Sequence, residues 1–186
     1  MLLLIDNFDS FSHILADYLR QTGKDLKIVR NDLDIASIKD DVFEGVILSP
    51  GPETPAKAGN LTGILEYYHD KIPVLGVCLG HQAIGEFFGA NLVKSNIPVH
   101  GKVHKVKKVS GHPVLRNLPD EFEVTRYHSL VLENLPGCLQ LLLETHQGEV
   151  MAIAHRELPI VGIQYHPEAH LTEFGLEIIK NWTKGL

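Results

Sequence analysis

The sequence contains few cysteines, no long hydrophobic run and no dense block of basic residues. Two cysteines in 186 residues are too few for a disulfide framework, so we expect a reducing, cytoplasmic setting. No apolar segment approaches the ~20 residues of a membrane helix, and the opening MLLLID lacks the basic leader of a signal peptide. The net charge of −6, without a long lysine or arginine cluster, excludes a nucleic-acid surface. We therefore expect neither a membrane nor a nucleic acid as a partner.

The sequence does contain an alternation of short apolar runs and amphipathic segments. Its length and its 44% of hydrophobic residues suit one globular domain, residues 1–186. The alternation predicts an α/β fold of three layers, with a mostly parallel central sheet flanked by helices. Strands are expected at 2–6, 26–32, 45–52, 73–78 and 159–168, and helices at 9–23, 60–70, 80–90 and 172–185. Successive strand patterns at 101–109, 122–133, 138–145 and 149–156 predict an antiparallel extension of the sheet.

One of the two cysteines lies where a strand pattern meets a helix pattern. GVCLG (76–80) has the layout of a nucleophile elbow, with Cys78 in the place of serine. The N-terminus of a helix favours a thiolate, and its free N–H groups, beginning with that of Leu79, donate to an oxyanion. The alternative is a buried structural cysteine at a tight turn. Cys138 lacks such a context, and we expect it in the core.

A thiolate nucleophile also needs a base and a group that orients the base. His166 ends the apolar run VGIQY, and Glu168 follows two residues later, so extended geometry would project both side chains to the same side. Functional groups in parallel sheets gather at the carboxyl ends of strands, where both Cys78 and His166 fall. The alternative is a capping histidine beside a solvated glutamate.

A third strand end carries the segment SPGPETP (49–55). Gly51 lies there between two prolines, in a stiff turn that either points a backbone N–H at a ligand or serves as an ordinary turn. No set of histidine, cysteine, aspartate and glutamate has the spacing of a tetrahedral metal site. We therefore expect no metal and no cofactor in this chain.

Four motifs together resemble the class I, triad-type glutamine amidotransferases: GVCLGHQAIG, SPGPETP, RYHSLV and GIQYHPE. They occur in the order typical of that family and extend over the whole chain. The segments LLLIDNFDSF, HGKV and VTRYHSLVLE further resemble the glutaminase subunits that serve chorismate-aminating synthases. The resemblance implies the flavodoxin-like fold of that family and the hydrolysis of L-glutamine to glutamate and ammonia.

The resemblance also implies a role for each motif residue. Cys78 would attack the amide carbon of glutamine, His166 would transfer the proton, and Glu168 would orient His166. The backbone N–H groups of Gly51 and Leu79 would form the oxyanion hole. The residues implied in substrate binding are Gly51, Pro52, Glu53, Gln82, Ser129 and Leu130.

The chain departs from the family pattern at two positions. Family members often have glycine where this sequence has Glu53. If the position requires a positive φ, a non-glycine residue is strained there. Ala169 stands where serine commonly follows the HPE motif, and the triad does not depend on that residue.

The implied partner is a chorismate-utilising synthase large subunit, which would take the ammonia for anthranilate or 4-amino-4-deoxychorismate synthesis and would hold Mg²⁺. HGKV (100–103) either faces that partner or forms a plain hairpin turn. Three alternatives are the glutaminase subunit of GMP synthetase, a non-catalytic regulatory or binding subunit, and a peptidase or other cysteine hydrolase. The DNFDSF and HGK segments count against the first, the complete triad against the second, and Gln82 with the SPGP loop against the third.

Overall fold

The computed structural model describes residues 1–95 and 99–186, whose strands form two sheets. The strands of the large sheet are β1 (Leu2–Asp6), β2 (Leu26–Arg30), β3 (Gly45–Leu48), β4 (Val74–Val77), β6 (Lys102–Lys108), β7 (Glu121–Arg126), β9 (Leu139–Thr145), β10 (Val150–His155) and β11 (Ile160–Ile163). Those of the small sheet are β5 (Asn91–Lys94) and β8 (Leu130–Glu133). In the described residues the large sheet has nine strands, in the order β2-β1-β3-β4-β11-β10-β9-β6-β7.

The large sheet has a parallel half and an antiparallel half. Strands β2, β1, β3, β4 and β11 pair in parallel. From β11 outward, β10, β9, β6 and β7 pair antiparallel. The α/β fold with an antiparallel extension, predicted from the alternation of patterns, is therefore confirmed.

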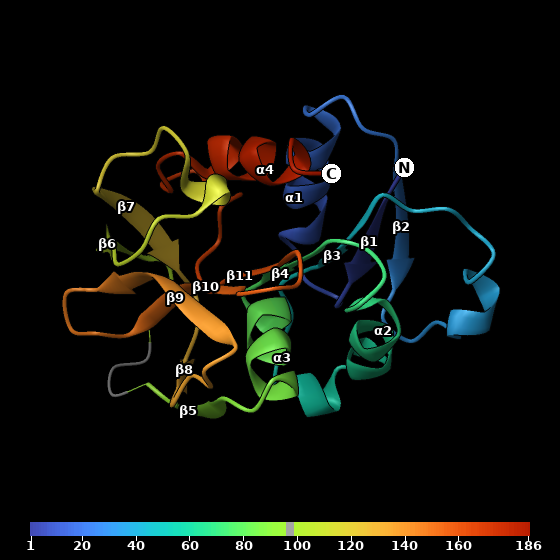
Figure 1. The fold of residues 1–186 in the computed structure, drawn as a ribbon, viewed down its shortest axis with the longest axis horizontal. Helices are drawn as coiled ribbons and strands as arrows, with labels where there is room; N and C mark the ends of the chain where they lie inside the picture. The colour runs from blue at the N-terminus through green and yellow to red at the C-terminus, as the bar shows by residue number, and fades with distance from the viewer. Residues whose placement is uncertain (96–98) are drawn as a thin grey trace.

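Helices cover both faces of the sheet. The helices are α1 (Ser12–Arg20), α2 (Leu61–Tyr68), α3 (Leu79–Phe87) and α4 (Gly175–Thr183). Figure 1 shows α1 and α4 on one face and α2 and α3 on the other. Each face has its own hydrophobic core: Leu15 and Trp182 belong to one, and Ile64 and Ile84 to the other. Because both faces are covered, a central strand such as β1 is a continuous apolar run rather than an alternating one.

Within residues 1–95 and 99–186, three 3₁₀ helices lie in the connections, at Ile35–Ser37, Pro55–Lys57 and Pro113–Leu115. Among the described residues, we find no helix that combines the length and the apolar character needed to cross a membrane.

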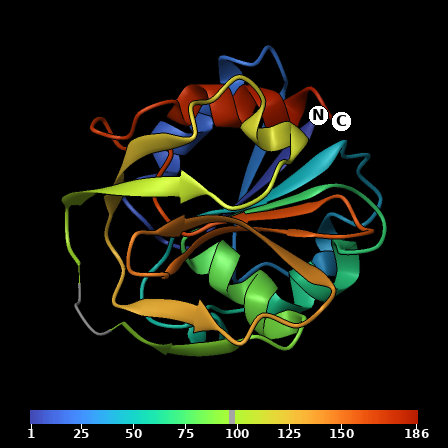
Figure 2. The same ribbon diagram turned by 60° about the vertical axis from the view of Figure 1, so that its left-hand side comes forward.

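The antiparallel extension differs from the expectation at one strand. The segment 122–133, predicted as one strand, divides into β7 and β8, which lie in different sheets. Strand β8 pairs with β5, a strand that the sequence analysis did not predict. Figure 2 shows this small sheet next to α3. It packs closely there because Gly85 of α3 has no side chain: a Cβ at that position would lie 2.2 Å from Leu132 Cδ1.

The carboxyl ends of the parallel strands bring four loops to one edge of the sheet. The Ser49 N–H donates to the Ile5 carbonyl at 3.1 Å, and the Cys78 N–H donates to the Ile163 carbonyl at 2.7 Å. These bonds fix the loops that follow β1, β3, β4 and β11 side by side. The predicted strand at 159–168 ends early, at Ile163, so the residues of GIQYHPE that follow Ile163 are free to turn.

Candidate active site

Cys78 occupies a strained position between β4 and α3. Its backbone has φ 51° and ψ −99°, a positive-φ conformation that ordinary residues rarely adopt. The glycines on either side make the turn possible. A Cβ on Gly76 would lie 2.4 Å from the Gly80 carbonyl carbon, and one on Gly80 would lie 2.3 Å from the Leu48 oxygen. The turn therefore presents the thiol at the start of α3, as in a nucleophile elbow.

His166 and Glu168 meet beside Cys78. The distance from His166 Nδ1 to Glu168 Oε1 is 2.7 Å, and both side chains are buried. The predicted geometry was wrong, because the two residues lie in a turn after β11 and not in an extended strand. Thr172 stabilises this turn, since its hydroxyl donates to the His166 carbonyl at 2.7 Å.

The surroundings of His166 favour its charged form. Burial alone would lower its pKa, but hydrogen bonds to the Cys78 sulfur and the Glu168 carboxylate outweigh burial and raise the pKa of His166 to about 10. Because Nδ1 faces Glu168, the other ring nitrogen, Nε2, is the one available to the sulfur. The three side chains thus form one hydrogen-bonded unit in which His166 carries a proton at neutral pH.

Two aromatic rings enclose the imidazole. The ring centroids of Phe11 and Tyr127 each lie 5.0 Å from that of His166, in T-shaped arrangements, and 5.0 Å from each other. Sequence reasoning missed this role, although both residues lie within the DNFDSF and RYHS motifs that it quoted. The rings limit rotation of His166.

A cavity next to Cys78 gathers the residues that the sequence analysis expected to bind substrate. Besides Cys78, its lining residues are Gly51, Pro52, Glu53, Gln82, Tyr127, His128, Ser129 and Leu130. Leu79 lies behind the cavity: a Cβ on Gly51 would come within 2.5 Å of Leu79 Cδ2 and 2.6 Å of Asn7 Cβ. Only glycine lets the SPGP loop approach the elbow this closely.

Glu53, which stands where family members often have glycine, has the positive φ that is strained for a non-glycine residue. Its φ is 63°, in the left-handed region where glycine is favoured. Its side chain is 60% exposed, and Oε2 lies 3.0 Å from Lys57 Nζ. The carboxylate therefore points toward solvent and Lys57, while the backbone of Glu53 remains at the cavity.

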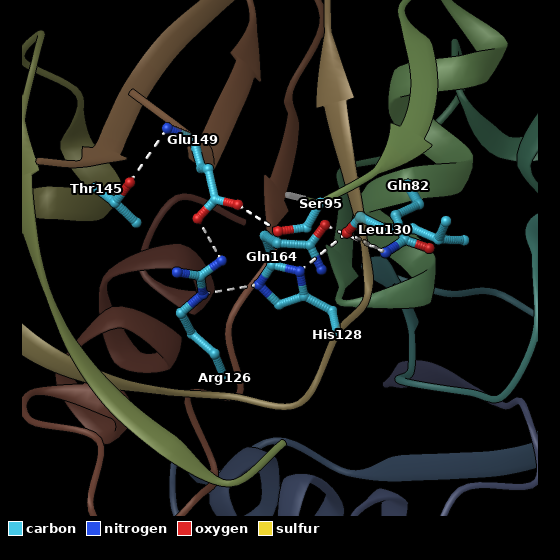
Figure 3. A network of polar contacts seen from close by, with 8 residues as sticks. All are labelled: Gln82, Ser95, Arg126, His128, Leu130, Thr145, Glu149 and Gln164. Atoms are coloured by element: carbon cyan, nitrogen blue, oxygen red, sulfur yellow. Dashed lines mark hydrogen bonds and ion pairs between the residues drawn. The ribbon is translucent and has the colours of Figure 1, made fainter. Parts of the chain in front are cut away.

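Gln82 and Gln164 connect the cavity wall with the thiol. Gln82 Nε2 donates to the Leu130 carbonyl at 3.3 Å and to Gln164 Oε1 at 3.2 Å (Figure 3). Gln164 Nε2 in turn donates to Cys78 Sγ at 3.7 Å. Sequence reasoning did not select Gln164, because it precedes His166 within an apolar run.

The part of the chain that the structure describes contains no group of three or more histidine, cysteine, aspartate or glutamate side chains placed to hold a metal ion. That this chain works without a cofactor stays a prediction from the sequence.

Two buried neutral histidines predict a loss of stability in mild acid. Burial lowers the pKa of His81 to about 3, and burial together with the charge of Arg126 lowers the pKa of His128 to about 4. Unfolded histidines titrate near ~6.5, so between that value and ~4 the unfolded chain binds more protons than the folded one. The free energy of unfolding should therefore fall by up to ~1.4 kcal/mol per pH unit for each histidine. Urea unfolding at about pH 6.5 and about pH 5.5 should differ by ~2 kcal/mol, because the unfolded histidines are already half protonated at the higher pH.

The raised pKa of His166 does not offset this loss. The stabilisation that results from the raised pKa of His166 is fully present below pH ~6.5. It is lost only as the pH rises toward about 10. A His128→Asn variant lacks one of the two groups, so its stability should depend on pH about half as steeply. Equal stability of the wild type at both pH values would contradict the prediction.

The chain resembles known proteins over nearly its whole length. Residues 3–185 match the family model described as glutamine amidotransferase class-I. The chain is 46% identical over 186 residues to anthranilate synthase component 2 of Azospirillum brasilense, covering 98% of this chain and 94% of that protein. It is 40% identical over 185 residues to aminodeoxychorismate/anthranilate synthase component 2 of Bacillus subtilis, covering 98% and 95%. Among solved structures, a Thermoplasma acidophilum protein named as a GMP synthase subunit is similar with a TM-score of 0.89 and 30% identity, covering 98% of this chain and 92% of that one.

Proposed function

The chain belongs to the class-I glutamine amidotransferase family, and we propose that it is the glutaminase subunit of a chorismate-aminating synthase. It hydrolyses L-glutamine to glutamate and ammonia, and it delivers the ammonia to a large subunit that makes anthranilate or 4-amino-4-deoxychorismate. The names of relatives with 40–46% identity over nearly the whole chain support this partner.

The single observation that carries the chemistry is the contact of Cys78, His166 and Glu168. The Cys78 sulfur attacks the side-chain amide carbon of glutamine, and His166 Nε2, opposite the nitrogen bound to Glu168, holds the proton. His166 then donates that proton to the departing ammonia, leaving a γ-glutamyl thioester. Water, deprotonated by the same nitrogen, hydrolyses the thioester to glutamate, which frees the Cys78 sulfur and leaves the proton on His166 as at the start.

The oxyanion formed at each step is held by the backbone. We assign its two donors to the N–H groups of Leu79, at the start of α3, and of Gly51, in the loop packed against it. Gln82 and the backbone of Ser129 and Leu130 line the cavity on the side where the amino-acid end of glutamine would lie. Pro52 and the backbone of Glu53 close the cavity from the SPGP loop.

The partner would dock where the triad opens to the surface. A second cavity at His166 is lined by Phe8, Ser10 and Phe11 from the DNFDSF loop and by His100 from HGKV. Phe8 is 52% exposed, as expected of an apolar side chain that a partner covers. We assign the Mg²⁺ requirement of chorismate chemistry to that partner. The free state of both cysteines is in keeping with a cytoplasmic protein.

A glutaminase subunit of GMP synthetase is the second candidate, because the similar solved structure bears that name. Its 30% identity is lower than the 46% of the anthranilate synthase relative, which favours the chorismate partner.

The test is co-purification from the source cell, followed by assays with glutamine and chorismate. We expect the chain to purify with a chorismate-binding subunit and the complex to form anthranilate or aminodeoxychorismate. Diazo-oxo-norleucine, a glutamine-like electrophile, should label Cys78. Activation by a nucleotide-binding synthetase alone would favour the second candidate, and cleavage of peptides without labelling would contradict both.

A further inference from the structure

An ion pair between the buried Arg126 and the partly buried Glu149 lies outside the triad and contacts His128 of the cavity wall. Arg126, at the end of β7, is only 2% exposed, and its Nη2 lies 2.5 Å from Glu149 Oε2 (Figure 3). The other carboxylate oxygen accepts from the Ser95 hydroxyl at 2.6 Å. The Glu149 N–H donates to Thr145 Oγ1 at 3.1 Å. The mechanism proposed above uses neither charged group.

The ion pair determines which nitrogen of His128 carries the proton. The Arg126 guanidinium only donates, so its Nε–H···Nε2 contact with His128, at 3.1 Å, requires an unprotonated Nε2. The proton of the neutral ring therefore sits on Nδ1, which donates to the Leu130 carbonyl at 2.9 Å. Burial and the charge of Arg126 lower the pKa of His128 to about 4, which keeps the ring neutral.

The Leu130 carbonyl connects this ring with the reacting sulfur. It accepts from both His128 Nδ1 and Gln82 Nε2, and Gln82 contacts Gln164, which contacts Cys78. Figure 3 shows the contacts from Thr145 to Gln164 as one network. His128 and Leu130 also line the cavity next to Cys78.

Stability alone does not account for this ion pair. The Arg126 guanidinium is removed from water, Glu149 is still 22% exposed, and well-packed apolar residues in place of such a pair often give equal or greater stability. The pair does fix the direction of the His128 side chain. The planar Arg126 guanidinium contacts Glu149 on one side and His128 on the other.

We propose that His128 is a positioning residue for the amino-acid end of glutamine: held by the Arg126–Glu149 pair, it fixes the Leu130 carbonyl and with it the Ser129–Leu130 backbone of the cavity. This role rests on the proposed glutaminase function. Because the amino-acid end is held alike in the ground state and the transition state, its loss acts on KM and not on kcat.

A pair of amide substitutions separates the two contacts of His128. Glutamine reaches the position of Nε2 and asparagine that of Nδ1, so His128→Gln keeps a partner for Arg126 but loses the donor to Leu130, whereas His128→Asn keeps that donor. We expect His128→Gln to raise the KM for glutamine ~10-fold and His128→Asn only ~2–3-fold, both with kcat within ~2-fold. The measurement is glutamate release by the complete complex.

Alkylation of Cys78 by iodoacetamide is the control, because this small reagent does not need the amino-acid end of the site. Its rate should be the same in both variants and in the wild type. If His128→Gln does not fold, the double variant Arg126→Met with Glu149→Leu removes the ion pair without leaving a lone charge. It should fold and show the same rise in KM.

The outcomes separate the two proposals. A wild-type complex that hydrolyses glutamine, with an unchanged KM in His128→Gln and in the double variant, would overturn the role of His128 alone. Equal losses of kcat in both amide variants would do the same. A wild-type complex without glutamine hydrolysis would overturn the proposed function and this role with it.

Discussion

A Cys78→Ala variant is expected to hydrolyse glutamine at least ~10⁴-fold more slowly than the wild type. Alanine leaves the oxyanion donors of the elbow in place but removes the atom that forms the thioester. Water would then have to attack the amide directly, without a covalent intermediate. Glutamate release by the complex measures the loss. Synthesis by the same complex from added ammonia should continue, because the ammonia-using site would belong to the partner.

The second cysteine supplies a matched control. Cys138 is half-buried just before β9 and packs against the α2–α3 face of the sheet, so Cys138→Ala should retain nearly full activity. Combining Cys78→Ala with His166→Ala should cost no more than Cys78→Ala alone, since the two side chains act as one unit. Hydrolysis above about one-hundredth of the wild-type rate in Cys78→Ala would contradict the thioester route.

The parallel half of the fold was predictable because all of its strands except the edge strand β2 are covered on both faces. Leu2, Leu3, Leu4 and Ile5 are all fully buried, and a strand in that environment is a short apolar run that local sequence displays directly. Helices α1, α2 and α4 were equally visible, since each has one buried face, whereas α3 is buried all round over Leu79–Gly85. Their ends differ from the prediction by one to three residues, as is usual for helix boundaries.

The break between β7 and β8 was not predictable from local sequence. The pattern of apolar and polar residues continues through Arg126–Leu130 without a glycine or proline to end the strand. What ends it is a set of contacts with a distant segment: Ser95 N–H donates to the Ser129 carbonyl, and Gly101 N–H donates to the Arg126 carbonyl. The cavity wall depends on this break.

The residues of the candidate site also divide into those that local sequence predicts and those that it does not. Cys78 and His166 stand out because each follows an apolar strand, so chemistry and position can be inferred together. Gln164 and Glu149 do not stand out, since they contact residues that are distant in the sequence. Gln164, for example, contacts Gln82 and Cys78, which precede it by 82 and 86 positions. Such pairings exist only in the folded sheet.

A Gly175→Ala variant is expected to lose at least ~3 kcal/mol of stability and most of its glutaminase activity. Gly175 begins α4, and a Cβ there would lie 1.8 Å from the carbonyl oxygen of Pro167, where real Cβ contacts stay above 3.0 Å. The helix resists moving, because Ile178 and Trp182 anchor it in the core. The turn that contains Pro167 must therefore shift, and it carries His166 and Glu168 with it. Urea unfolding and glutamate release by the complex measure the two effects.

Gly111 and Gly137 provide controls for the loss of a glycine as such. Neither has an atom within 4 Å of a Cβ added to it, and neither has a positive φ, so alanine at either position should change stability by less than ~0.5 kcal/mol. If Gly175→Ala matched these controls in stability and activity, α4 would not determine the position of the turn. If Gly175→Ala lost activity but not stability, only the turn that contains Pro167 would have moved. The catalytic geometry would then depend on α4 more strongly than the stability of the fold does.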